Sequence, residues 1–304
     1  MSKRSVIFLT AFCIFGLTFA IVPQKKKRTR KVQKTEDNRV YLIHSDMLFY
    51  EQYKISDAQF LNGFVQFKLN VANLFCDSAH FYEASNSFEA FGNVKMYQGD
   101  TLTLFSDYAY YDGNEQMAEA RFNVVLTHRK SKLYTDSLNF DRLYNIGYFF
   151  EGGKLVDNGS VLTSDWGEYD TKTRMAVFNY DVRLRNKKFY LTSDTLYYDT
   201  GKSLAHVIGP SNITSGNSHI YTENGYYNTK TDYSELFGRS VMKDKGKSVI
   251  GDSVYYDSKT GTSEAFGNVI YTDSINKNKL TGDYCWYDEN TGYAMATKRA
   301  VAID

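Results

Sequence analysis

A short segment recurs nine times along the chain at nearly constant spacing. Each copy begins with an acidic residue, has a small or apolar residue two positions later and an aromatic residue four positions later. The acidic residues are Asp46, Asp77, Asp107, Asp136, Asp165, Asp194, Glu223, Asp252 and Asp283, and successive ones lie 29 to 31 residues apart. A period of this length is typical of stacked supersecondary units, so the sequence predicts a repeat protein.

Each copy alternates with a period of two residues, as in a strand that is buried on one face. After Asp194, for example, Leu196 and Tyr198 belong to the restricted positions, whereas Tyr197 stands at a position that varies between polar and aromatic residues. Side chains at alternate positions of a strand point to opposite faces of a sheet. An aromatic content of 16% and only two prolines also favour strands over helices.

A tight turn and a second strand complete each unit. Residues 257–261 and 288–292 combine Asp, Thr and Gly in the manner of hairpin loops. In the strand that follows, glycine stands 15 positions after the acidic residue at Gly92, Gly209, Gly238 and Gly267. A glycine inside a strand marks a bulge or bend. We therefore predict an all-β fold, an elongated array of about nine two-stranded repeats with about eighteen short strands. These strands form two facing sheets or a roll with open end strands.

The first residues have the features of an export signal. Lys3 and Arg4 precede an apolar run from Val6 to Val22. We predict a signal peptide at 1–20, a basic linker at 21–39 and a repeat domain at 40–304, and hence an exported protein. An uncleaved membrane anchor is the alternative for the apolar run, and binding to anionic lipid is the alternative for the linker.

Charge is distributed unevenly along the chain. Nine basic residues come before the first acidic one, and residues 35–304 hold 27 basic and 35 acidic residues, a net charge of about −8. Because phosphate contacts dominate nucleic-acid affinity, such an acidic body is not expected to have a nucleic-acid partner.

The repeat pattern (S/T/G)-D-x-φ-x-(Y/F)-D, followed by a turn and A-x-G-N-V, resembles the OstA-like family, relatives of LptA. The pattern extends from Ser45 to Val269, and the repeats cover about 260 of the 304 residues. The resemblance implies a periplasmic β-jellyroll that carries lipopolysaccharide toward the outer membrane. It implies lipopolysaccharide or lipid A as cargo, and other jellyroll proteins of an export bridge as partners through edge-strand addition, with self-association as a further expectation.

No catalytic or metal-binding motif is apparent. A calcium site needs several oxygens in one short loop, so we interpret each repeated Asp as an acceptor of backbone N–H bonds at a strand start or turn. Neither the five histidines nor Cys76 and Cys285 show metal-ligand spacing. We expect no enzyme activity and no cofactor.

The candidate binding site is the apolar stripe that the repeats turn inward. We select for it Leu48, Tyr50, Phe81, Leu138, Phe140, Leu196, Tyr198, Val254, Tyr256 and Tyr287. The stripe is either a plain core or a groove that accepts acyl chains.

Three functions remain open. The leading one is lipopolysaccharide transport, and the second is a structural scaffold of the cell envelope with a filled core. In the scaffold the outer residues Tyr197, Tyr226, Tyr255 and Trp286 would make the contacts. The third is an outer-membrane barrel, which Asn139 and Glu168 on the less restricted face disfavour.

Overall fold

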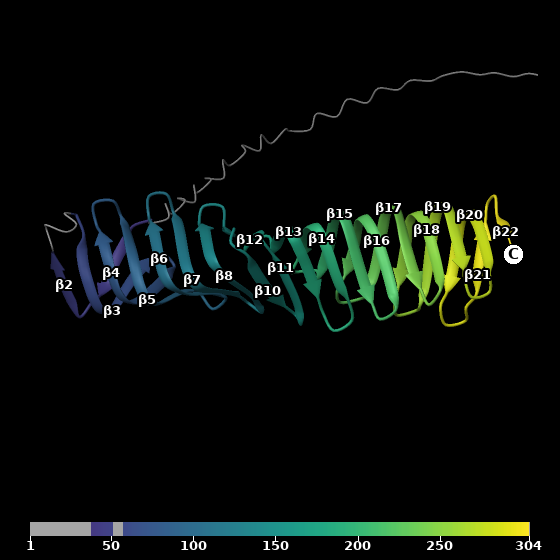
Figure 1. Ribbon diagram of the computed structural model, residues 1–304. Helices are drawn as coiled ribbons and strands as arrows, with labels where there is room; N and C mark the ends of the chain where they lie inside the picture. Colours follow the sequence, from purple (N-terminus) through teal and green to yellow (C-terminus); the bar gives the residue numbers. More distant parts are fainter. Residues whose placement is uncertain (1–37, 51–56, 304) are drawn as a thin grey trace, which may run out of the picture. The chain divides into compact units, whose positions relative to one another are not determined.

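The computed structural model describes residues 38–50 and 57–303, and the predicted signal peptide and nearly all of the basic linker lie outside them. The described residues form one antiparallel sheet of 22 strand segments, which follow one another in chain order (Figure 1). The segments are β1 (Val40–His44), β2 (Met47–Tyr50), β3 (Gln59–Leu69), β4 (Ala72–Tyr82), β5 (Ser87–Gln98), β6 (Leu102–Asp112), β7 (Met117–His128), β8 (Ser131–Asp141), β9 (Ile146–Phe149), β10 (Gly153–Asp157), β11 (Ser160–Ser164), β12 (Trp166–Asp170), β13 (Met175–Arg185), β14 (Tyr190–Asp199), β15 (Leu204–Ser215), β16 (Ser218–Asn228), β17 (Tyr233–Asp244), β18 (Lys247–Asp257), β19 (Thr262–Asp273), β20 (Asn278–Asp288), β21 (Ala294–Thr297) and β22 (Val301–Ile303). The all-β prediction is confirmed. Within the described part of the chain, no helix has the length and apolarity needed to cross a membrane.

Alternate strands bend in the middle at a bulge. In β5, Gly92 and Asn93 have φ angles of 72° and 45°. The pairing with β6 shifts between Phe91 and Val94, and the pairing with β4 shifts between Phe91 and Lys95. The additional residue reverses which side chains point inward, so apolar residues before and after the bend reach the same interior. The predicted bend is found at all four glycines named above, each of which has a positive φ.

Repeated Asp residues stabilise these bends from the middle of their strands, which corrects our prediction that each accepts backbone N–H bonds at a strand start or turn. Asp77 lies in the middle of β4, and the Asn93 amide of β5 donates a 2.8 Å hydrogen bond to its carboxylate. The pair Asn123–Asp107 has the same arrangement at 2.6 Å and the pair Asn268–Asp252 at 3.1 Å.

The turns are held by a different acidic residue, five positions further along the repeat. The Asp112 carboxylate accepts the backbone N–H groups of Asn114 and Glu115 at 2.9 and 3.0 Å. The same role belongs to Asp141, Asp170, Asp199, Asp257 and Asp288. Asp is therefore used twice per repeat, once at the bend and once at the turn.

The bends divide the sheet into two arms. Arm A contains the strand halves that meet at the hairpins of residues 70–71, 99–101 and 129–130 and at their equivalents. Arm B contains the halves that meet at turns such as 83–86, 113–116 and 142–145. Four pairs of segments, β1 with β2, β9 with β10, β11 with β12 and β21 with β22, are the halves of single bent strands. The expected number of about eighteen strands is thus correct, but each strand contributes to both arms instead of to one of two sheets.

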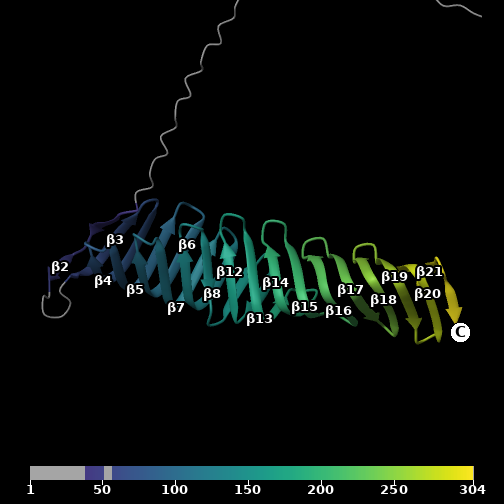
Figure 2. The same ribbon diagram turned by 90° about the horizontal axis from the view of Figure 1, so that it is seen from above.

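The arms pack face to face and enclose the core. The Phe67 ring of arm A stacks on the Phe88 ring of arm B with centroids 4.3 Å apart. The buried apolar residues form two clusters, one with members from Val40 to Ile213 and one from Leu236 to Cys285. Figure 2 shows the turns along both borders of the strand array.

The described sheet has open end strands, as predicted. β1 and β2 both pair with β3, and β21 and β22 both pair with β20. No other described strand covers either pair. Each end therefore presents backbone groups to which a further strand could add.

Candidate functional site

The structure brings eight of the ten predicted stripe residues to the interior between the arms. The buried ones are Phe81, Leu138, Phe140, Leu196, Tyr198 and Val254. Tyr256 and Tyr287 are partly buried near the second core cluster, against which Tyr287 packs. All eight belong to arm B, because they follow the bend in their strands. Whether they bind a ligand stays a prediction.

Leu48 and Tyr50 do not lie in the interior. Their side chains are 48% and 65% exposed. Both belong to β2, whose described partner is β3 alone, so no strand on the other side completes a pocket around them. The repeat pattern places them at inward positions, but at the end of the sheet that pattern does not produce burial.

The residues that arm A contributes to the interior were not predicted from the sequence. Arm A contributes an aliphatic residue three positions before the repeated acidic residue, and this row includes Leu74, Leu104, Leu133, Leu162, Leu191 and Val249, all buried. The sequence does contain a pattern that indicates this row, since every copy of the repeat has Leu, Ile or Val at this position. It was overlooked because the acidic residue was placed at the start of its strand instead of in the middle.

The space between the arms is largely filled. A cavity of about 30 Å³ lies beside Leu138 and Phe140, and one of about 10 Å³ lies beside Phe149 and Leu155. A larger cavity of about 130 Å³ is found around Ile220, where the two core clusters separate. For comparison, an engineered apolar cavity of about 150 Å³ admits benzene. The interior is thus a packed core with gaps and not a continuous open slot.

Tyrosine hydroxyls mark the border of this interior. The Tyr198 hydroxyl donates to Asp157 at 3.2 Å, and the Tyr227 hydroxyl donates to Asp232 at 2.8 Å. Burial raises the pKa of Tyr198 to about 12, so this hydroxyl is neutral at physiological pH. Such a surface offers hydrophobic contact along its length and hydrogen bonds only at the border.

The two cysteine thiols of the described residues are buried in the fold. Burial raises the pKa of the Cys76 thiol to about 12 and that of the Cys285 thiol to about 11. Both are therefore protonated and unsuited to nucleophilic chemistry. In residues 38–50 and 57–303, no three His, Cys, Asp or Glu side chains are grouped so that they could hold a metal ion.

The comparison with protein families decides the classification. The family model described as OstA-like protein matches residues 37–194 and 226–304, which is most of the chain. The chain belongs to the OstA-like family. Among solved structures, this OstA-like chain is similar to LptH from Pseudomonas aeruginosa, the LptA-homologous periplasmic component of that organism's lipopolysaccharide transport device. The sequence identity is 16%, the TM-score is 0.25, and the alignment covers 48% of this chain and 94% of LptH. No curated protein matches the sequence.

Proposed function

We propose that this OstA-like protein carries lipopolysaccharide through the periplasm and holds the acyl chains between arm A and arm B. The observation that carries the proposal is the apolar lining of both arms, repeated along the strand array, with cavities along it. Burial of apolar surface is non-directional, so this lining needs no specific polar contact with a chain. Each buried CH₂ group contributes about 0.8 kcal/mol, so a ten-carbon chain gains about 8 kcal/mol.

Binding requires the arms to part, because even the cavity of about 130 Å³ is smaller than an acyl chain needs. The backbone hydrogen bonds run within each arm, and the arms are joined at the bends. Parting therefore leaves the sheet intact and breaks side-chain contacts between the arms, such as the Phe67–Phe88 stacking. Contacts with the acyl chain offset that loss.

The proposed partners are supported by the open end strands of the sheet, and the proposed location by the export signal that the sequence predicts. The open end strands provide templates to which like jellyroll proteins of an export bridge, or a second copy, could add. The predicted export signal leads to the periplasm. The sequence has no nucleotide-binding motif, so the energy for directional transport is supplied by another protein.

Site-specific photocrosslinking tests the proposal. Benzoylphenylalanine replaces Phe140 or Tyr198, which face the interior, and in a control it replaces Tyr197, which faces outward. The purified protein is illuminated with lipopolysaccharide, and adducts are detected on immunoblots. Adducts from positions 140 and 198 but not from 197 are expected. Absence of adducts from both interior positions, in variants whose circular dichroism is that of the wild type, would contradict acyl binding between the arms.

A structural scaffold is the second candidate, and the filled interior favours it. Its binding surface would be the outer face, where an aromatic row crosses consecutive strands from Tyr226 through Phe237 and Tyr255 to Phe266, with ring centroids 5.7 to 6.4 Å apart. Alanine substitutions in this row that abolish function, together with tolerance of volume-matched changes at Leu138 and Leu196, would favour the scaffold.

A further inference from the structure

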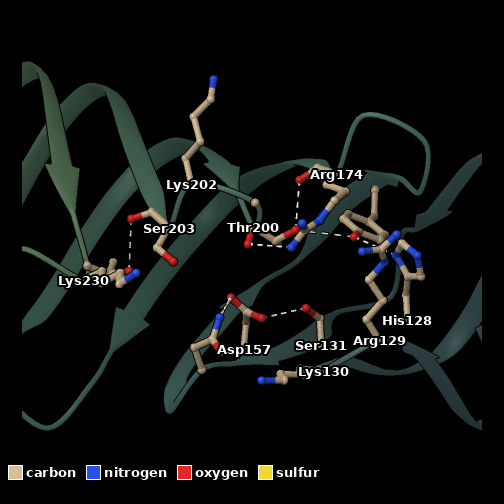
Figure 3. Close-up of a pocket in the computed structure, with 14 residues that line it drawn as sticks. His128, Arg129, Lys130, Ser131, Asp157, Arg174, Thr200, Lys202, Ser203 and Lys230 are labelled. Carbon is tan, nitrogen blue, oxygen red and sulfur yellow. Dashed lines mark hydrogen bonds between the residues drawn. The ribbon is translucent and has the colours of Figure 1, made fainter. Parts of the chain in front are cut away.

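A polar pocket of about 970 Å³ lies where the free borders of the two arms meet. Hairpins of arm A contribute residues 128–131 and 157–158, and turns of arm B contribute Arg174, residues 200–203 and residues 229–230. Figure 3 shows both groups around one space. The pocket thus contains groups from several repeats that are far apart in the sequence.

The pocket is strongly basic, although the body of the protein is acidic. Five cationic side chains line it, those of Arg129, Lys130, Arg174, Lys202 and Lys230, together with one carboxylate, that of Asp157. Lys202 pairs with Asp199 at 3.4 Å and extends away from the other cations in Figure 3. Within the described residues, the other four form no ion pair.

The single carboxylate of the pocket is engaged within the fold. Asp157 is 3% exposed and accepts hydrogen bonds from Ser131 Oγ at 2.6 Å, Asn158 Nδ2 at 3.1 Å and the Tyr198 hydroxyl at 3.2 Å. It therefore helps to hold the two arms together, and among the described residues it forms no ion pair with the cations, which outnumber it.

Arg174 and Arg129 place positive charge beside His128 in the lining of the pocket. Arg174 Nη2 donates to the Thr200 carbonyl at 3.0 Å, whereas its buried Nε–H has no hydrogen-bond partner among the described residues. Burial lowers the pKa of His128, and the charges of Arg129 and Arg174 lower it further. His128 therefore stays neutral near pH 7 while both guanidinium groups remain charged, which leaves a local excess of positive charge.

The basic pocket adjoins the apolar interior. His128, Ser131 and Tyr169 line it and also line the small cavity formed by Phe149, Leu155 and other core residues. The His128 ring and the Tyr169 hydroxyl, 2.9 Å apart, connect the arms at this boundary. An anionic group in the pocket would thus lie directly above an apolar compartment.

We propose that this pocket binds the phosphate groups of an amphipathic lipid whose acyl chains enter the interior beneath it. Guanidinium and ammonium groups are the side chains that bind phosphate best, Arg through paired hydrogen bonds and Lys as a point charge. The apolar core that adjoins the pocket favours a lipid over a free phosphate compound. The assignment of the tail rests on the proposed function, whereas that of the phosphate rests on the pocket.

The test compares three ligands with the full chain: lipopolysaccharide, the same material after enzymatic removal of its phosphates, and inorganic pyrophosphate. The variant is Arg129→Gln with Lys130→Gln, two exposed hairpin residues whose side chains form no hydrogen bond or ion pair with the described residues. The matched control is Lys259→Gln, an exposed lysine on a turn of arm B outside the pocket. Wild type and control are expected to bind phosphorylated lipopolysaccharide at least about tenfold more tightly than the dephosphorylated form, and the double variant is expected to lose that preference.

The outcomes separate the two proposals. Equal affinity of the wild type for both lipids would overturn the phosphate site and leave lipid transport intact. If neither lipid binds but pyrophosphate does, and the double variant abolishes that binding, the site is confirmed for free phosphates and the transport proposal fails. A preference for phosphate that survives in the double variant would place the phosphate elsewhere and overturn the assignment.

Discussion

The bend of β5 offers a sharp test of how the repeated Asp shapes the fold. In Gly92→Ala, a Cβ atom would lie 2.6 Å from Oδ2 of Asp77 at a φ of +72°. The left-handed conformation costs an L-residue about 1–2 kcal/mol. Displacement of the Asp77 carboxylate also breaks the 2.8 Å hydrogen bond from Asn93, which adds about 1 kcal/mol. We expect the free energy of unfolding to fall by about 2–3 kcal/mol in total.

Gly99→Ala is the matched control, because Gly99 has a φ of +57° but no atom within 4 Å of the added Cβ. This substitution should cost only the conformational part, about 1–2 kcal/mol. Urea denaturation followed by circular dichroism measures both, and amide hydrogen exchange in β4 and β5 detects local opening that a repeat protein can undergo. In an Asp77→Ala background, Gly92→Ala should cost no more than Gly99→Ala does. Equal costs of Gly92→Ala and Gly99→Ala in the wild-type background, or strict additivity with Asp77→Ala, would refute the reasoning.

Three further predictions concern the core, the thiols and the response to acid. Leu196→Ala, at a fully buried site, should lower the free energy of unfolding by about 2–5 kcal/mol, whereas Leu48→Ala at the exposed end should change it by only about 0.5 kcal/mol; similar values in urea denaturation would contradict the burial difference. Cys76 and Cys285 should resist iodoacetamide at pH 8 in the folded protein and react once urea unfolds it, so rapid alkylation of the native protein would contradict their raised pKa values. The Arg299 side chain lowers the pKa of Asp283, and the Asn290 backbone N–H lowers that of Asp288. Because the folded pKa of each lies below the ordinary 3.8, their contribution is complete above that value and is lost as the pH falls through the folded pKa. Amide protection in β20 and β21 should therefore decrease between pH 5 and pH 2, and unchanged protection would count against these contacts.

Much of the fold could be predicted from the sequence because the repeat is local. The alternation around residues such as Leu196 and Tyr198 identifies the strands, and Gly92 identifies the bend, since both signals lie within one unit. The course of each strand was harder to predict. Asp77 was placed at the start of a strand, because a polar residue before an alternating segment is typical of a turn, whereas the structure uses it in the middle of one.

The site was only partly predictable, because it depends on contacts between distant units. The inward row of arm B follows from alternation, but the packing of the arms, which decides whether the interior is open, depends on pairs such as Phe67 and Phe88. The basic pocket has no motif at all. Arg129 and Lys230 belong to turns of different repeats, and they line one pocket because the two arms are folded against each other.

The central claim, that the arms part to admit acyl chains, is tested most directly by the distance between them. Nitroxide labels at Lys132 on arm A and Lys172 on arm B, both exposed, report that distance by pulsed electron–electron double resonance. Labels at Lys95 and Lys132, both on arm A, provide the control. Saturating lipopolysaccharide should lengthen the distance between the arms and leave that within arm A unchanged. An unchanged distance between the arms in a protein that has bound lipopolysaccharide would contradict the account.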